Sequence, residues 1–392
     1  MEQILIAEEF EGKMCAVLLE DGTAVEVLAS DSSHPQINGN IYLGRIENII
    51  PGINAAFVDI GLDKNAIIAL DELKEGLHSA QDIKCGHMLP VQVIKLPGGQ
   101  KGVQVSSNIK LAGMRCVLLP YTAGTGVSKK IEDHAEAERL RSIAKRLAPQ
   151  GMGIILRTNA QGTEETELLE EINRLKDIWD RIENKSRILR RPTLLYDDSN
   201  VIFKAVRDMV SSYTVRIIAS DKRIYEELHA YINDLSPDAL DKLTLRSTDT
   251  SLFTLYRIKA QIDKALMQKV ILKSGAFLVF DKTEALTVID VNSGSFTGKS
   301  DAEETALKTN LEAAREIAVQ LRLRDIGGII IIDFIDMKHE ASKQTLLAEL
   351  RNELRKDHDR ARAFDITQLG LAEVTRKRKN ESLETVFNGR NH

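Results

Sequence analysis

The stretch LTVIDVNSG, at residues 286–294, decides the fold of the carboxyl-terminal part of the chain. Its apolar residues predict a β-strand, and strand side chains alternate between the two faces of a sheet. Asp290 and Asn292 lie two residues apart, so both would project from one face. A buried carboxylate without a partner is costly, so this pair needs a cation, hydrogen-bond donors or open water.

A second apolar run, GGIIIIDFIDM at residues 327–337, also predicts a strand that ends in acid. Asp333 lies near its carboxyl end and Asp336 just beyond it. Functional groups of α/β sheets collect at strand ends of this kind. A right-handed strand–helix–strand crossover would lay the two strands parallel and bring Asp290 and Asp333 together.

The segment between these strands carries one long helical pattern, from Ser300 to about Arg324. Ser300 is expected to be the N-cap, with Glu303 completing a capping box. A helix at 338–356 and the short apolar run AFDITQ follow the second strand. This succession predicts a doubly wound α/β sheet.

Two interpretations of the acids stay open. Acids at strand ends commonly cap helices, form turns or pair with basic side chains, and each acid taken singly fits that role. Three oxygen-bearing side chains on adjoining strands favour a hard cation. Mg²⁺ takes one or two protein carboxylates and keeps several waters, so Asp290, Asp333 and Asn292 would suffice, with Mn²⁺ as a substitute. The eight histidines show no His-x-x-x-His spacing, so we expect no zinc.

The composition is that of a globular protein with more than one domain. The 392 residues are too many for one ordinary core, and 43% are hydrophobic and 28% charged. No apolar run approaches membrane-spanning length and the amino terminus lacks a charged leader, so we expect a cytoplasmic protein without a membrane span. Cys15, Cys85 and Cys116 form no Cys-x-x-Cys pair, which predicts reduced thiols.

The net charge of −5 means that nucleic-acid binding would rest on local basic patches. The densest patches are VSKKI at 127–131, RILRRP at 187–192 and TRKRKN at 375–380. The last of them supplies Arg376 and Arg378 as candidate RNA contacts. A solvated surface is the alternative for every patch.

The amino-terminal half reads as β-structure. The first thirty residues predict a meander with a hairpin turn at Asp21-Gly22. Five short strands with glycine turns over residues 41–111 predict a small closed barrel of the OB type. Such barrels bind single strands through aromatic and basic side chains, and the candidates here are Phe57, Lys101 and Lys110. A core position is the alternative for a lone phenylalanine in a strand.

Residues 112–270 mix helix and strand. Helical periodicity is clear at 134–147 and 164–184, and between them the apolar strand GMGIILRTNA delivers Arg157 and Thr158 together. A guanidinium beside a hydroxyl would grip a terminal phosphate, although an ordinary strand end is the alternative.

Further on, YTVRIIAS at 213–220 predicts a strand and FTLYRIKAQIDKALMQKV at 253–270 an amphipathic helix, whose basic residues would line a nucleic-acid channel or face water. No Walker-type or dinucleotide glycine motif occurs, which argues against a nucleotide-binding Rossmann enzyme.

Several stretches, in this order, resemble the ribonuclease E/G family of bacterial endoribonucleases. They are NIYLGRI at 40–46, AAFVDIG at 55–61, GMGIILRT at 151–158, TEALTVIDVNSG at 283–294, EETALKTNLEAAREIAVQLRLRDIGGIIIIDFIDM at 303–337 and GLAEVTRKR at 370–378. The resemblance covers almost the whole chain, and the block at 290–336 is its most specific part.

The resemblance implies an α/β multidomain architecture. An RNase H-like segment would be split between residues 1–35 and 202–265, with an OB-type RNA-binding barrel inserted at 36–111. A 5′-sensor region would span 112–201, and a DNase I-like catalytic domain 266–392.

The resemblance also implies roles for single residues. Asp290 and Asp333 would be the magnesium ligands, and Asn292 would help to orient the scissile phosphate. A 5′-monophosphate would be held by Arg157 and Thr158. Phe57 would stack on a base.

The implied function is that of a magnesium-dependent endoribonuclease. It would cleave single-stranded, A/U-rich RNA with a preference for a 5′-monophosphate, leave a 5′-phosphate and a 3′-hydroxyl, and act in mRNA decay and RNA processing, ribosomal RNA included. Two alternatives remain: a non-catalytic RNA-binding scaffold or regulator, and a metal-dependent DNA nuclease or phosphatase.

Two departures from the family pattern stand out. Ile67 occupies a position where phenylalanine is frequent, so one stacking platform is missing. After SLETV at 382–386, relatives place a paired-cysteine zinc element. We therefore expect either a ribonuclease G-like short form without that element or a truncated chain. Contacts between catalytic domains would still allow a homodimer.

Overall fold

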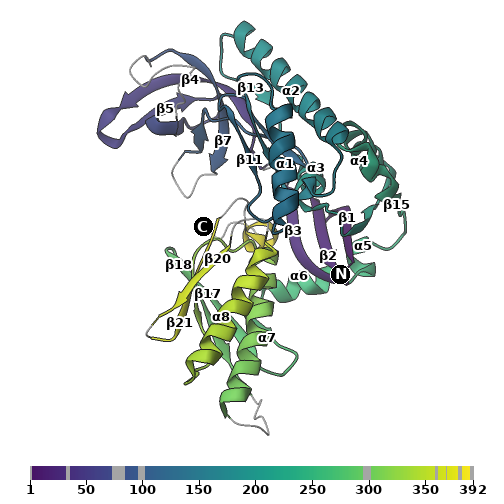
Figure 1. The fold of residues 1–392 in the computed structure, drawn as a ribbon, viewed down its shortest axis with the longest axis vertical. Helices are drawn as coiled ribbons and strands as arrows, with labels where there is room; N and C mark the ends of the chain where they lie inside the picture. The colour runs from purple at the N-terminus through teal and green to yellow at the C-terminus, as the bar shows by residue number, and fades with distance from the viewer. Residues whose placement is uncertain are drawn as a thin grey trace. The chain divides into compact units, whose positions relative to one another are not determined.

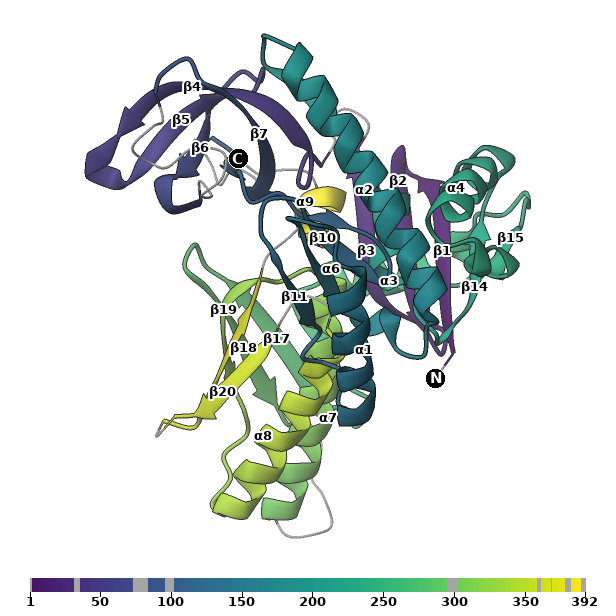
Figure 2. The same ribbon diagram turned by 45° about the horizontal axis from the view of Figure 1, so that its top comes forward.

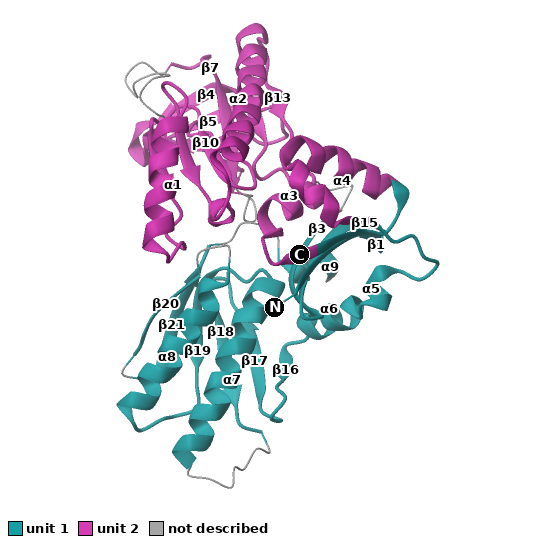
Figure 3. Cartoon of the chain, turned by 45° about the vertical axis from the view of Figure 1, so that its right-hand side comes forward, with its two compact units in different colours: residues 1–31, 216–222, 245–392 teal, residues 32–215, 223–244 magenta. Residues whose placement is uncertain are grey.

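The computed structural model describes residues 2–31, 36–72, 84–95, 102–294, 302–357, 361–367, 369–377 and 382–388. The chain separates into two compact units (Figure 3). Unit 1 comprises Met1–Asp31, Arg216–Lys222 and Leu245–His392, and unit 2 comprises Ser32–Val215 and Arg223–Thr244. Both units mix helices and strands, as the sequence predicted, and each is described by itself.

The first sheet of unit 1 is built on the predicted meander. Its strands are β1 (Gln3–Phe10), β2 (Lys13–Glu20) and β3 (Thr23–Asp31), and β14 (Thr214–Ala219) and β15 (Leu243–Leu245) complete the order β15-β14-β1-β2-β3. Asp21 and Gly22 have φ values of 48° and 80°, the left-handed conformation that a two-residue hairpin turn requires. The predicted hairpin is therefore confirmed.

The single helix predicted at 253–270 is wrong. The structure has α5 (Leu252–Leu255), then Arg257 in the left-handed region with a φ of 54°, then α6 (Ile258–Leu266). Residues Lys269–Ile271 form strand β16, which pairs with the following strand. The apolar periodicity continues across the break, so the pattern alone did not reveal it.

The second sheet of unit 1 carries the two acidic strands. Its order is β16-β17-β18-β19-β21-β20. Strands β18 and β19 run parallel, and the other neighbours in this sheet are antiparallel. The remaining bounds are β17 (Phe277–Lys282), β18 (Leu286–Asn292), β19 (Gly328–Asp333), β20 (Arg362–Ile366) and β21 (Leu371–Arg376).

Helices α7 (Ala302–Leu323) and α8 (Glu340–Arg355) lie side by side on one face of this sheet (Figures 1 and 2). Their buried side chains pack on Leu278, Ile289 and Ile332, which all belong to that face. The opposite face carries half-buried and exposed residues, among them Ile329, 52% exposed. The prediction of a doubly wound sheet is therefore wrong, because the helices that the structure describes cover only one face. A short helix, α9 (Leu383–Asn388), packs on β3.

Unit 2 contains the predicted barrel. Strands β4 (Ile41–Ile50), β5 (Ala55–Asp59), β6 (Ala66–Ala69), β8 (Gln104–Ser106) and β7 (Met88–Lys95) follow one another, and a β4–β7 pairing closes the ring. A Cβ at Gly44 would come within 2.5 Å of Val58 Cγ1, so only glycine lets β4 pass this close to the barrel core. The predicted closed five-stranded barrel is confirmed, and it is consistent with an OB-type fold.

The rest of unit 2 is a four-stranded sheet covered by long helices. The sheet has the order β11-β12-β10-β9. Trp179 is 2% exposed in its core and meets the edge of Tyr121, with ring centroids 5.0 Å apart. Bounds are β9 (Leu111–Ala112), β10 (Cys116–Leu119), β11 (Gly124–Val127), β12 (Gly153–Leu156), α1 (His134–Leu147), α2 (Glu165–Ile188), α3 (Val201–Met209) and α4 (Lys222–Leu235). Strand β13 (Thr193–Tyr196) belongs instead to the barrel sheet, where it pairs with β4. The helices predicted at 134–147 and 164–184 are confirmed.

Among the helices that the structure describes, none combines the length and the apolar character needed to cross a lipid bilayer.

Candidate active site and RNA-contact residues

Asp290 and Asp333 are direct partners in the parallel ladder between β18 and β19. Partners in register project from the same face of a sheet. That face is the one that α7 and α8 leave uncovered, because Ile289 and Ile332, the preceding partners, point into the core. The predicted crossover therefore brings the two carboxylates together on the open face of the sheet.

Asn292 joins the pair, as the spacing of two predicted. Its Nδ2 donates a hydrogen bond to Asp290 Oδ2 at 2.5 Å. Partial burial, with the negative charges of Asp290 and Asp336, raises the pKa of Asp333 above its usual range. Over the described part of the chain, no lysine or arginine forms an ion pair with Asp290 or Asp333. The cluster thus holds uncompensated negative charge that a cation would neutralise.

Two side chains of α7 fix the segment that carries Asp333 and Asp336. Asn310 is fully buried, and its amide donates to Ile335 O at 2.8 Å and accepts from Ile335 N at 3.0 Å. The carboxylate of Glu303 accepts from the backbone N–H of Lys338 at 2.8 Å and of His339 at 3.0 Å. Neither of these two sets of hydrogen bonds was predicted from the sequence. A polar Asn310 in line with the apolar face of a helix is the signal that would have found the first.

The helix between the acidic strands begins at Ala302. Ser300, the predicted N-cap, lies outside the described residues. Glu303 was the predicted partner in the capping box. In the structure its two carboxylate oxygens accept hydrogen bonds from the backbone N–H groups of Lys338 and His339, which follow β19. Its role here is to join the start of α7 to that segment.

Arg157 and Thr158 follow β12 at its carboxyl end, and Ser128 follows the neighbouring parallel strand β11. The hydroxyls of Ser128 and Thr158 lie 3.0 Å apart. Strand ends of a parallel pair thus collect a guanidinium and two hydroxyls in one place.

The guanidinium of Arg157 is already engaged. It forms an ion pair with Asp208 at 2.7 Å and donates to the carbonyl oxygens of Gly113 at 2.6 Å and Arg207 at 3.2 Å. Its side chain keeps 24% of its surface exposed. An anion bound here would share Arg157 with Asp208.

Phe57 projects from the outer face of the barrel, because its neighbours Ala56 and Val58 are buried in the interior. Its cross-strand partners are Asn48 on β4 and Ile67 on β6. Ile67 therefore lies beside Phe57 on the same half-buried face. The alternation along β5 therefore places Phe57 on the outer face of the barrel and not in its core.

The candidate basic contacts separate into different environments. Lys110 is exposed at the end of the barrel, and its backbone is fixed by Gln92, whose Oε1 accepts from Lys110 N at 2.9 Å. Lys101 and Arg378 lie outside the described residues. The placement of Lys110 is compatible with a nucleic-acid contact.

Arg376 was predicted to lie in a basic patch on the surface, but the structure buries it. Its side chain is 1% exposed and forms ion pairs with Asp325 and Asp357, the latter at 2.7 Å, and its Nη1 donates to Ile326 O. A guanidinium enclosed in this way neutralises two core carboxylates and does not reach RNA. The predicted RNA contact at Arg376 is therefore wrong.

The comparisons with known proteins agree with the resemblance seen in the sequence. The model of the ribonuclease E/G family matches residues 110–379. Ribonuclease E of Nostoc sp. is 38% identical over 98% of this chain and 57% of its own length. Ribonuclease G of Escherichia coli is 35% identical over 94% of this chain and 78% of its own length.

Ribonuclease E of Synechocystis sp. is 37% identical over 98% of the chain and 58% of its own length. The chain thus spans a little more than half the length of these two ribonuclease E relatives. The family match covers both the strands with the acidic residues and the segment with Arg157. The chain belongs to the ribonuclease E/G family.

Proposed function

We propose that this protein is an endoribonuclease that cleaves single-stranded RNA with the help of Mg²⁺ held by Asp290 and Asp333. The observation that carries the proposal is their direct pairing in a parallel ladder, on an open sheet face and without a basic partner among the described residues. The names of the relatives, ribonuclease E and ribonuclease G, support the same activity.

The donor set fits a hard divalent cation. The described residues contain no group of three or more His, Cys, Asp or Glu side chains placed to hold a metal ion. An ion bound by two carboxylates would complete its shell with waters and substrate oxygens, which suits Mg²⁺, or Mn²⁺ in its place, and not a closed zinc site. When bound, Mg²⁺ would stabilise the charge that develops on the phosphodiester and would lower the pKa of an attacking water.

Asn292 would position the scissile phosphate. Its amide carries two hydrogens, and Asp290 Oδ2 accepts one of them. The second hydrogen can be donated to a phosphate oxygen of RNA bound beside the carboxylates. Asn310 and Glu303 would keep the Asp333–Asp336 segment in place during the reaction. The products would be a 5′-phosphate and a 3′-hydroxyl.

The barrel would bind the single-stranded RNA substrate. Base stacking on Phe57 and charge from Lys110 suit single-stranded RNA of mixed sequence, and weakly paired A/U-rich RNA would be the most accessible. With Ile67 beside it, Phe57 would offer one aromatic platform where two are frequent in the family.

Arg157, Thr158 and Ser128 would form the sensor for a 5′-monophosphate. The guanidinium is held in a fixed orientation by Gly113 and Asp208, and the two hydroxyls lie within reach of one another. A terminal monophosphate offers more negative charge and more acceptor oxygens than a hydroxyl end. We therefore propose that monophosphorylated RNA is the preferred substrate.

The finer architecture is also a proposal. Residues 1–35 with 202–265 would be an RNase H-like segment, 112–201 the 5′-sensor region and 266–392 a DNase I-like catalytic domain. The protein would act in the cytoplasm, in mRNA decay and RNA processing, and two copies would pair through the catalytic domains.

One assay tests the proposed function. An A/U-rich, 5′-monophosphorylated RNA oligonucleotide is incubated with the protein with and without Mg²⁺, beside the same sequence as DNA. We expect discrete internal cuts in the RNA only when Mg²⁺ is present. RNA binding without cutting would favour the scaffold, and equal cutting of DNA would favour a general nuclease.

A further inference from the structure

The segment Gly113–Cys116 is the part of unit 2 against which Arg157 is held. The backbone N–H of Arg157 donates to Arg115 O at 2.7 Å. Its Nη1 donates to Gly113 O at 2.6 Å. Two carbonyl oxygens of one short segment thus fix both the backbone and the guanidinium of the same arginine.

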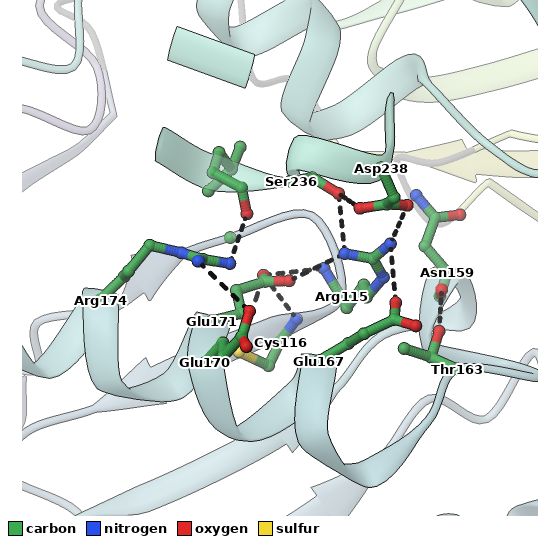
Figure 4. A network of polar contacts seen from close by, with 12 residues as sticks. Arg115, Cys116, Asn159, Thr163, Glu167, Glu170, Glu171, Arg174, Ser236 and Asp238 are labelled. Atoms are coloured by element: carbon green, nitrogen blue, oxygen red, sulfur yellow. Dashed lines mark hydrogen bonds and ion pairs between the residues drawn. The ribbon is translucent and has the colours of Figure 1, made fainter. Parts of the chain in front are cut away.

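The other side of that segment is held by Glu171 of α2 (Figure 4). Its Oε1 accepts from the backbone N–H of Arg115 at 2.9 Å and of Cys116 at 3.3 Å. The side chain of Glu171 is 0% exposed. Glu171 thus binds N–H groups of the segment Gly113–Cys116, and Arg157 binds its carbonyl oxygens.

The fit of Glu171 depends on a glycine. A Cβ at Gly113 would lie 2.0 Å from Glu171 Oε1 and 3.0 Å from its Cδ. The backbone N–H of Gly113 also donates to Cys116 O at 2.8 Å, which closes the segment into a tight turn. The carboxylate thus occupies the space that a side chain at position 113 would need.

Arg115 compensates the buried charge of Glu171. Its guanidinium lies 3.8 Å from Glu171 Oε2 and is anchored by Ser236 Oγ at 2.7 Å and Asp238 at 2.5 Å (Figure 4). Glu167, one turn earlier on α2, lies 3.5 Å from the same guanidinium and is 45% exposed. Unlike Glu171, Glu167 makes no described hydrogen bond to the backbone of residues 113–116.

We propose that Glu171 is a positioning residue for the 5′-end sensor: it fixes the Gly113–Cys116 turn and through that turn places the guanidinium of Arg157 for a terminal phosphate. The inference rests on the proposed role of Arg157 in binding a 5′-monophosphate. Glu171 itself lies behind the turn and does not touch RNA.

The variants separate positioning from folding. Glu171→Gln keeps an acceptor oxygen for the two N–H groups, whereas Glu171→Leu removes it at similar size. Gly113→Ala attacks the same junction from the opposite side, because its methyl group would displace the carboxylate. Its φ is not in the left-handed region, so alanine adds no backbone strain. Glu167→Gln is the matched control, because it removes a charge beside Arg115 and leaves the turn intact.

The readout is the ratio of kcat/KM for 5′-monophosphorylated RNA to that for the same RNA with a 5′-hydroxyl. We expect Arg157→Ala to bring this ratio near one and Glu171→Leu and Gly113→Ala to lower it by about tenfold, since a charged donor is misplaced. Glu171→Gln and Glu167→Gln should keep the wild-type ratio. Thermal unfolding of each variant is followed in parallel. If Glu171→Leu does not fold, the ratio measured for Gly113→Ala tests the proposal instead.

The outcomes distinguish the two proposals. A wild-type ratio near one overturns the proposed sensor, and the inference with it. A wild-type preference that Arg157→Ala removes but that Glu171→Leu and Gly113→Ala retain leaves the sensor standing and overturns the role of Glu171. Loss of the preference in Glu167→Gln to the same extent would also overturn it, because the effect would then follow charge near Arg115.

Discussion

Asp290 on β18 and Asp333 on β19 are register partners on the sheet face that no helix of the described chain covers. Neighbouring carboxylates repel one another, and partial burial together with the charges of Asp290 and Asp336 raises the pKa of Asp333. A folded protein keeps such an arrangement at a cost in stability, and a bound cation would offset that cost.

Removing one carboxylate should abolish cleavage and spare RNA binding. Asp290→Asn keeps the shape of the side chain and removes the charge, so we expect the Mg²⁺-dependent rate to fall by about a hundredfold or more. Cleavage rates and RNA affinity are measured on the same preparation. Asp281→Asn, on the same sheet face at β17, is the control and should cut RNA normally. Cleavage by Asp290→Asn at the wild-type rate would contradict the assignment.

The pH dependence of stability should reveal the raised pKa of Asp333. The native state binds this proton more tightly than the unfolded chain, so the group contributes stability that is present at low pH and is lost as the pH rises through the native pKa. In metal-free buffer Asp333→Asn should therefore unfold at a higher temperature than the wild type at neutral pH. The difference should shrink as the pH falls, and Mg²⁺ should raise the Tm of the wild type alone. A Tm difference independent of pH would contradict this reading.

The barrel surface should gain affinity from a second ring. In Ile67→Phe the new side chain would lie beside Phe57 on the outer face, where stacking on a base contributes about 1 kcal/mol, or roughly fivefold in Kd for single-stranded RNA. Fluorescence anisotropy with an uncleavable oligonucleotide measures it. Ile68→Phe is the contrast: Ile68 is 0% exposed inside the barrel, so the larger side chain should lower stability without improving binding. Unchanged affinity in Ile67→Phe would mean that RNA does not cross this face.

Arg376 should matter for folding and not for RNA. Arg376→Ala removes the guanidinium that pairs with the buried carboxylates of Asp325 and Asp357, which is expected to cost about 3–5 kcal/mol in the free energy of unfolding. Chemical denaturation measures the loss, and RNA affinity is measured at a temperature where the variant is folded. Weakened RNA binding at unchanged stability would restore Arg376 to the RNA-contact surface.

The candidate site was predictable where the pattern is local. Alternation in residues 286–292 placed Asp290 and Asn292 on one face, and the helix between two strands implied that Asp333 would lie beside Asp290. The closed barrel followed from five short strands with glycine turns. In each case the two-residue alternation of a strand or the 3.6-residue period of a helix was sufficient for the prediction, because these local patterns determine which side chains face the core.

The wrong predictions concern features that depend on contacts between residues far apart in the sequence. Arg376 was assigned to the surface from its basic neighbours, but its partners Asp325 and Asp357 are separated from it by 51 and 19 positions. The face that α8 covers depends on packing against α7. The break at Arg257 interrupts an apolar period that continues on both sides. Asn310 and Glu171 were missed because their partners are backbone groups of Ile335, Arg115 and Cys116 in other segments.

Direct observation of the ion is the measurement that bears most on the central claim. Crystals soaked in Mn²⁺ would be measured for anomalous scattering, with Asp333→Asn crystals treated in the same way. The account predicts one anomalous peak between the carboxylates of Asp290 and Asp333 in the wild type, and its loss in the variant. A map without a peak at these two side chains, or with the same peak in Asp333→Asn, would contradict it.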